Sequence, residues 1–186
     1  LTNQIMKTIS IILLALGLTF GAQAQFKKAT VQATGLTCAM CSRATYEALE
    51  TLPFVDKITT DLDNTTFILT FKSGVPVSID AIKGKVEDAG FSVGKMVMTA
   101  NFDKVNVQDD AHISFAGNTL HFMHVKHQLL SGDRDITIID KDFVTAKQFK
   151  KFSTETSMTC YKTGMMSDCC KLDATPASLR VYHVTI

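Results

Sequence analysis

Residues 35–44 read Gly-Leu-Thr-Cys-Ala-Met-Cys-Ser-Arg-Ala and place two cysteines, Cys38 and Cys41, three positions apart. The residues before them, 28–33, read as a strand, and residues 42–52 have apolar side chains at helical spacing. We therefore expect Cys38 in a loop and Cys41 at the start of a helix. Gly35, just before the loop, allows the left-handed or tight backbone conformation that such a turn requires.

The start of a helix is a favourable place for negatively charged sulfur. Unpaired backbone N–H groups and the positive end of the helix dipole face this point, and both stabilise the thiolate form of cysteine. Two thiolates at the spacing of Cys38 and Cys41 can close on one ion. Because no other ligand lies nearby in the sequence, the pair suits a soft ion that is content with few ligands, such as Cu(I).

The loop resembles the metal-binding loop of the heavy-metal-associated domain, the family of copper chaperones, of copper-ATPase amino-terminal domains and of the periplasmic mercury-binding protein. The family loop reads Gly-Met-Thr-Cys-x-x-Cys, and residues 35–41 depart from it only at Leu36, which replaces the Met. Leu and Met are close in volume, so we expect the exchange to be tolerated. The resemblance covers residues 26–98.

This resemblance implies a metal carrier without enzymatic activity. Cys38 and Cys41 would bind the ion and pass it to a partner by ligand exchange. Cu(I) is the ion that the pair favours, and the same site would accept Hg(II), Zn(II) or Cd(II). The implied partner is a metal-transporting ATPase or an efflux component.

The elements of this segment can also be read from the residues themselves. Pro53 ends the first helix, Ser78 opens a second one and Gly90 stops it. The expected strands are 28–33, 55–62, 66–71 and 92–98, and the expected helices are 42–52 and 79–89. This order, strand–helix–strand–strand–helix–strand, predicts an α+β fold, a ferredoxin-like βαββαβ sandwich, which is also the fold that the resemblance implies.

Residues 1–24 read as a secretory signal peptide. Lys7 gives a short basic start, residues 9–20 are apolar, and Ala22-Gln23-Ala24 forms a small-x-small cleavage site. The apolar run is too short to span a bilayer comfortably. Cleavage would remove one basic and no acidic residue and leave the two charges balanced, which gives no electrostatic case for binding nucleic acid or a membrane surface. We therefore expect a periplasmic or otherwise exported protein, in an oxidising compartment.

The rest of the chain resembles no family that we can name. Residues 99–110 are polar and are expected to form a linker. Residues 111–186 read as a small mostly-β domain, a barrel or a sandwich, with one short helix. The helix is expected after a capping box, Thr145 to Gln148, and Gly117-Asn118 indicates a hairpin.

All five histidines of the chain and three of its cysteines fall in this second segment. On a strand, His121, Met123 and His127 would share one face. The simpler interpretation is a half-exposed sheet face with ordinary histidines, and the sharper one is an auxiliary copper site of thioether, imidazole and thiol ligands. The candidates for such a site are Cys160, Cys169, Cys170, Met165, Met166, His121, Met123 and His127.

The three late cysteines allow another interpretation. In an exported protein the default is a structural disulfide, here from Cys160 to Cys169 or Cys170. A bond between the adjacent Cys169 and Cys170 would need strained geometry. The alternatives are that all three thiols bind metal, together with Met165 or Met166, or that they carry redox chemistry.

Two further classes of function remain open. Cys38 and Cys41 at a helix start also fit a thiol–disulfide oxidoreductase, although the element order differs from the thioredoxin type. The second segment could instead be an interaction module that docks onto an efflux complex. No Ser/His/Asp set, phosphate loop or carboxylate pair is spaced convincingly for catalysis, so we assign no catalytic residue.

Overall fold

The computed structural model describes residues 25–170 and 179–186, apart from the side chain of Cys169. The expected signal peptide, residues 1–24, lies outside the described residues. Within these ranges, no helix is long and apolar enough to cross a membrane.

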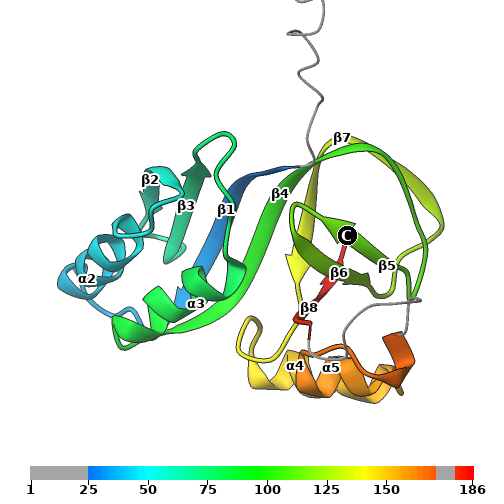
Figure 1. Cartoon of the computed structure of the whole chain (residues 1–186). Helices are drawn as coiled ribbons and strands as arrows, with labels where there is room; N and C mark the ends of the chain where they lie inside the picture. Colours follow the sequence, from blue (N-terminus) through cyan, green and yellow to red (C-terminus); the bar gives the residue numbers. More distant parts are fainter. Residues whose placement is uncertain (1–24, 171–178) are drawn as a thin grey trace, which may run out of the picture.

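The first half of the molecule has the predicted order of elements (Figure 1). The elements are β1 (Gln25–Thr34), α2 (Ala39–Glu50), β2 (Val55–Asp61), β3 (Thr66–Phe71), α3 (Ile79–Asp88) and β4 (Ser92–Val107). The strands lie side by side in the order β2-β3-β1-β4, and their pairs are antiparallel. This is the split βαβ arrangement of a ferredoxin-like fold. The prediction for residues 26–98 is confirmed in element type and order.

Strand β4 differs from the prediction and changes the architecture. It was expected to end near Met98 and to be followed by a linker at 99–110, but it continues to Val107. Alternate side chains of the continuation are buried, with Ala100 and Phe102 almost fully inaccessible. They alternate with polar residues, as on a strand with one solvated face. The stretch is polar because one of its faces meets water, so most of the expected linker is strand.

The second half extends the same sheet. Its strands are β5 (His112–Phe115), β6 (Asn118–Phe122), β7 (Gln128–Ile138) and β8 (Val181–Thr185), and the full order is β2-β3-β1-β4-β7-β8-β6-β5. The described part of residues 111–186 thus has four strands, and they continue the sheet of the first half instead of forming the separate barrel or sandwich that was expected. In Figure 1, β4 runs diagonally between the two halves and belongs to both.

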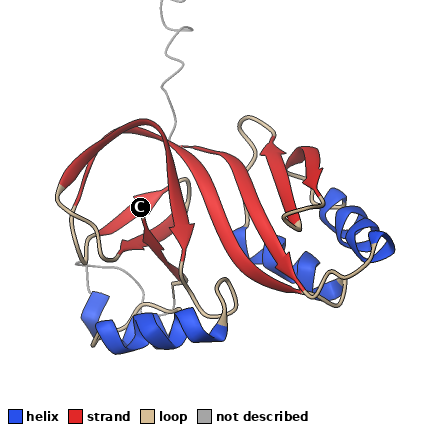
Figure 2. Ribbon diagram, turned by 180° about the vertical axis from the view of Figure 1, so that it is seen from behind, coloured by secondary structure: helices blue, strands red, loops and turns tan. Residues whose placement is uncertain are grey.

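Local sequence explains the turns and helices of this half. Ala116 and Gly117 both have positive φ, as in the tight turns that connect hairpin strands. Thr145 caps α4 (Ala146–Glu155) through the predicted capping box with Gln148. Where one short helix was expected, the structure has α4, the shorter α5 (Thr159–Thr163) and the 3₁₀ turn η1 (Asp168–Cys170). Figure 2 shows α4 and α5 together at one end of these strands.

One hydrophobic core runs through both halves. It includes Leu49 and Ile79 under the first two helices and Phe122 on β6. At the junction, the ring of Phe115 lies 4.7 Å from that of Phe102 and 5.1 Å from that of Phe26. Packing and the shared strand β4 thus join the two halves into one unit.

Candidate metal centres

The loop pair lies at the exposed start of α2. Cys38 is the N-cap residue, with extended backbone, and its sulfur accepts a hydrogen bond from the N–H of Cys41 at 3.2 Å. The Cα atoms of the two cysteines are 5.2 Å apart and their sulfurs form a disulfide in this structure. Cys38 is exposed and Cys41 is partly exposed. Both sulfurs therefore lie at the positive end of a helix, where a ligand from another molecule can approach.

Two apolar side chains support the loop. Leu36, which occupies the position of the family Met, is partly buried against the core, and so is Phe91. Gly35 has φ +87°, and a Cβ there would lie 3.7 Å from the Phe91 ring. Met40, between the two cysteines, is 72% exposed and points to solvent. The loop thus has an apolar base and a solvated tip.

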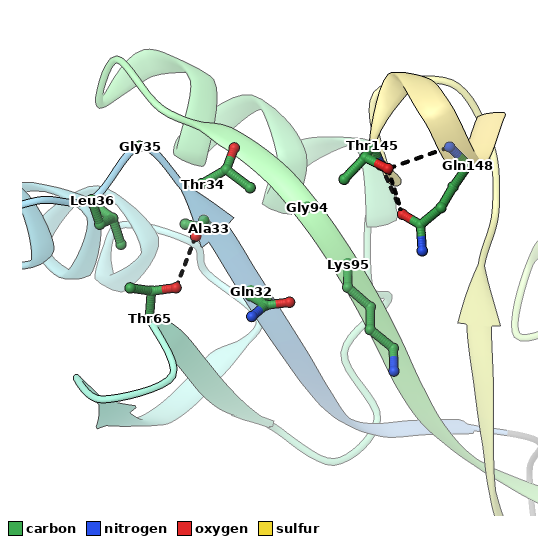
Figure 3. Close-up of a pocket in the computed structure, with 10 residues that line it drawn as sticks. All are labelled: Gln32, Ala33, Thr34, Gly35, Leu36, Thr65, Gly94, Lys95, Thr145 and Gln148. Carbon is green, nitrogen blue, oxygen red and sulfur yellow. Dashed lines mark hydrogen bonds between the residues drawn. The ribbon is translucent and has the colours of Figure 1, made fainter. Parts of the chain in front are cut away.

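A polar hollow of about 510 Å³ lies beside this loop (Figure 3). Its walls come from the end of β1, the loop residues Gly35 and Leu36, and the start of α4 at Thr145 and Gln148. Neither Cys38 nor Cys41 lines it. The hollow therefore borders the cysteine loop but contains no soft ligand.

A second concentration of soft ligands lies inside the other half. His121 on β6, Cys160 on α5 and His183 on β8 are each fully buried, and one ligand atom of each lies within 4.8 Å of the others. The sulfur of Cys160 is 3.3 Å from Nε2 of His183 and 3.8 Å from Nδ1 of His121. Sheet pairing produces this proximity, because β6 and β8 run parallel with His121 opposite His183.

The outer nitrogens of both histidines contact carboxylates. Nδ1 of His183 donates to Oδ1 of Asp140 at 2.6 Å, and Nε2 of His121 donates to Oδ1 of Asp110 at 3.2 Å. Burial, with the nearby imidazoles of His112 and His183, lowers the pKa of His121 to about 3. The His121 ring is thus neutral, and its nitrogen nearer Cys160, Nδ1, is left as an electron-pair donor.

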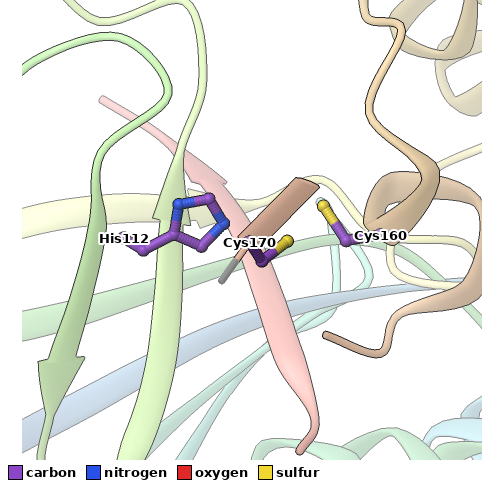
Figure 4. Close-up of side chains that lie close together, drawn as sticks. All are labelled: His112, Cys160 and Cys170. Atoms are coloured by element: carbon purple, nitrogen blue, oxygen red, sulfur yellow. The ribbon is translucent and has the colours of Figure 1, made fainter. Parts of the chain in front are cut away.

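Cys170 and His112 extend the cluster on its other side. Their ligand atoms and the sulfur of Cys160 all lie within 4.8 Å of one another, and Figure 4 shows the three side chains converging from η1, β5 and α5. The His112 ring stacks on that of His121, with centroids 4.0 Å apart. Nε2 of His112 is buried and has no hydrogen-bond partner among the described residues.

The other auxiliary candidates lie elsewhere. Strand β6 ends at Phe122, and His124 has φ +58°, so the expected alternation through Met123 to His127 does not occur. Met123 packs against Ile139, Val144 and Tyr161, whereas His127 is exposed. Their shared face with His121 was predicted wrongly, because a left-handed residue turns the chain.

Of the two remaining methionines proposed as ligands, only one packs against the buried cysteines. Met166 is buried in a cluster with Cys160 and Cys170, whereas Met165 is 37% exposed. Cys160 and Cys170 are not joined to each other by a disulfide in this structure. The side chain of Cys169 lies outside the described part of the chain, so a bond between Cys160 and Cys169 stays a prediction.

Sequence reasoning missed His112 and His183 as members of the cluster, as well as Asp140. One signal was available: a two-residue turn at Ala116-Gly117 places His112 opposite His121, which is the observed register. No local signal places His183, because β8 follows more than 50 residues after β6 and joins it by a parallel pairing.

Comparison with known proteins identifies a family for most of the first half. Residues 30–92 match the model of the heavy-metal-associated domain family. The solved structures similar to this chain include the yeast copper transporter domain Ccc2a (28% identity, 35% of this chain and 88% of that one, TM-score 0.32). They also include the CopZ metallochaperone (23% identity, 36% of this chain and 97% of that one, TM-score 0.33). A third is a copper-binding domain of the P-type ATPase HMA7 (35% identity, 35% of this chain and 86% of that one, TM-score 0.32).

No curated protein matches the chain. The family match includes the complete loop with both cysteines and most of the βαββαβ unit described above. The chain therefore contains a heavy-metal-associated domain at residues 30–92.

Proposed function

We propose that this chain is an exported heavy-metal-binding protein, a Cu(I) chaperone or scavenger that binds the ion through Cys38 and Cys41. The observation that carries the proposal is the position of the pair. Both sulfurs lie at the solvent-exposed start of α2, inside the segment that matches the heavy-metal-associated family. An enzymatic role is not part of the proposal.

The location suits a site that must release its ion. When the pair is reduced, the N–H groups at the start of α2 stabilise the thiolates, which are the binding form. Exposure of Cys38 lets a thiol of a partner attack the bound ion, so the ion passes on by exchange of one ligand at a time. A disulfide between the same sulfurs excludes metal, and bound metal in turn keeps both as thiolates.

The choice of Cu(I) rests on the donor set. Within residues 25–100 there is no histidine and no other cysteine. Two sulfur ligands satisfy Cu(I), whereas structural Zn(II) takes four ligands. Hg(II) and Cd(II) are thiophilic and would compete. The partner would be a metal-transporting ATPase or an efflux component that supplies its own thiols.

X-ray absorption on the anaerobically reconstituted whole chain tests this proposal. We expect one Cu(I) at the loop with a shell of two sulfurs, and Cys38→Ser/Cys41→Ser should lose this one equivalent together with its two-sulfur signal. Met40→Leu is the matched control and should retain the ion, because that side chain points to solvent. A nitrogen-dominated shell at the loop, or unchanged sulfur coordination in the double variant, would contradict the proposal.

A thiol–disulfide oxidoreductase is the second candidate, and one observation favours it. Cys38 and Cys41 are disulfide-bonded in this structure, and Cys38 is exposed to a substrate. Reductase or isomerase turnover that requires Cys38 and persists with a copper chelator would support this alternative. Negligible turnover, together with protection of both thiols from alkylation by Cu(I), would favour the metal carrier.

A further inference from the structure

The buried cluster in the second half lies outside the family match and has no role in the carrier proposed above. Its five members come from three separate stretches of the sequence, namely β5 with β6, α5 with η1, and β8. Chain folding thus gathers two buried thiols, two buried imidazoles and the partly buried imidazole of His112. Such groups are the ligands that Zn(II) and copper take in proteins.

We propose that Cys160, His121 and His183 hold a second metal ion, Zn(II) or copper, in the interior of the molecule. Cys170 is a candidate for a fourth ligand, because its sulfur lies within 4.8 Å of that of Cys160. The ring of His112 stacks on that of His121 beside these ligands. The site is distinct from the loop pair in its ligands, its depth and its half of the sheet.

The distances fit an ion between the three groups. With Zn–S near 2.3 Å and Zn–N near 2.0 Å, a tetrahedral ion separates its sulfur and nitrogen ligands by about 3.5 Å. The observed separations from the Cys160 sulfur are 3.3 Å to His183 and 3.8 Å to His121. These two sulfur–nitrogen separations therefore need to change by only about 0.3 Å to match a bound ion.

The carboxylates orient both imidazoles for this role. Metal-binding histidines usually donate their outer N–H to a carboxylate or carbonyl, which fixes the ring and the tautomer. Asp140 does this for His183, and Asp110 does it for His121. Asp140 is itself held by Arg180, whose Nη2 lies 3.1 Å from Oδ2. The donor atoms are thus aimed before any ion arrives.

The same contacts resemble a Cys–His–Asp arrangement for nucleophilic catalysis, and burial argues against that use. Cys160 has no exposed surface, and neither have His121 and His183. A substrate could not reach the sulfur without opening the fold, whereas a single ion needs little room. A buried ion would also tie α5 and η1 to the sheet, so we expect slow exchange there and fast exchange at Cys38.

Metal titration of the whole chain in the background Cys38→Ser/Cys41→Ser tests the proposal. The variant is purified under reducing, anaerobic conditions, stripped with a chelator and offered Zn(II) or Cu(I) alone. We expect the variant to retain one equivalent of Zn(II) or of Cu(I). X-ray absorption of the bound ion should show both sulfur and imidazole ligands. Adding Cys160→Ser should abolish retention, whereas adding His127→Ala, an exposed histidine, should not change it.

The absorption spectrum keeps the test decisive if Cys160→Ser fails to fold, because it is recorded on protein with all cluster residues intact. No retained ion, a sulfur-only shell or a nitrogen-only shell would overturn the proposal. So would mass-spectrometric mapping of a disulfide from Cys160 to Cys169 or Cys170 in protein isolated from an oxidising compartment. A negative result in this experiment does not bear on Cu(I) binding by Cys38 and Cys41, because both cysteines are replaced in the sample.

Discussion

The two cysteine-containing sites of this chain lie in opposite surroundings. Cys38 is exposed in a short loop at a helix start, with its neighbour Cys41 three residues away. Cys160 is fully buried, and its polar neighbours come from strands that lie far from it in the sequence. An exposed pair of like ligands suits transfer, because a partner can replace one ligand at a time. A buried, mixed set with fixed tautomers suits retention.

The two sites also differ in how strongly the stability of the fold depends on them. At the loop, water and the helix N-terminus stabilise charge, so little folding energy depends on the two sulfurs. In the cluster, Asp140 is 2% exposed, and burial of such a carboxylate is tolerated only because Arg180 and His183 pair with it. Changes around the cluster should therefore affect stability, and changes in the loop should affect binding.

The largest effect should come from the core that both regions share. Phe102→Ala removes a buried ring at the junction of the two halves, and we expect it to lower the free energy of unfolding by about 3–5 kcal/mol. Denaturant unfolding should remain one transition, because β4 belongs to both halves. Leu129→Ala, an exposed position on β7, should change stability by less than about 0.5 kcal/mol. Two separate transitions in the parent protein would show that the halves are independent.

A smaller effect should separate buried from exposed carboxylates. Asp140→Asn weakens charged contacts to His183 and Arg180 in the interior, so we expect a loss of about 1.5–3 kcal/mol in metal-free protein. Asp133→Asn is the matched control, because its contact with Lys27 at 2.8 Å is half exposed and screened by water, so its loss of stability should be clearly smaller. Urea titration of both variants with a chelator present measures the difference. Equal losses would mean that burial of Asp140 has no special consequence.

The two sites also differ in how far they could be predicted from the sequence. The loop was predictable because Gly35, Cys38 and Cys41 act through local geometry, and the helix follows at once. The ferredoxin-like order was predictable for the same reason, since each element carries its own periodicity and caps. The length of β4 was not predicted, although the alternation of Ala100 and Phe102 with polar residues was visible in the sequence.

The buried cluster was only partly predictable, because register decides it. The imidazoles of His112, His121 and His183 lie in one row across β5, β6 and β8. The hairpin turn specifies the first pairing, but nothing near His183 in the sequence specifies the second. His127 was assigned to the same face because the left-handed turn at His124 was not anticipated. The long-range pairing of β8 and the left-handed turn at His124 were therefore the two features that were not predicted.

The helix caps give a third prediction, about 1 kcal/mol in size. Thr145 accepts a hydrogen bond from the N–H of Gln148, and its own N–H donates to the Gln148 side chain. Thr145→Ala should lower stability by about 1 kcal/mol, since it removes the first of these bonds at the start of α4. Because α4 buries none of its residues fully, the loss should be seen as faster amide hydrogen exchange in its first turn. Thr154→Ala, near the other end, is the control and should leave that turn protected.

The smallest effect should have the opposite sign, and it concerns the cap of α2. Cys38 occupies the N-cap position, where its sulfur is a weak acceptor for the N–H of Cys41. Serine is among the preferred N-cap residues, so Cys38→Ser in reduced, metal-free protein should raise the free energy of unfolding by up to about 0.5 kcal/mol. Cys41→Ser lies inside the helix and should give no such gain. If Cys38→Ser instead destabilises the reduced protein by more than about 1 kcal/mol, the sulfur has a structural role. A gain in stability, with the loss of Cu(I) binding, would mean that the loop retains a poorer cap because the thiolate is needed for the ion.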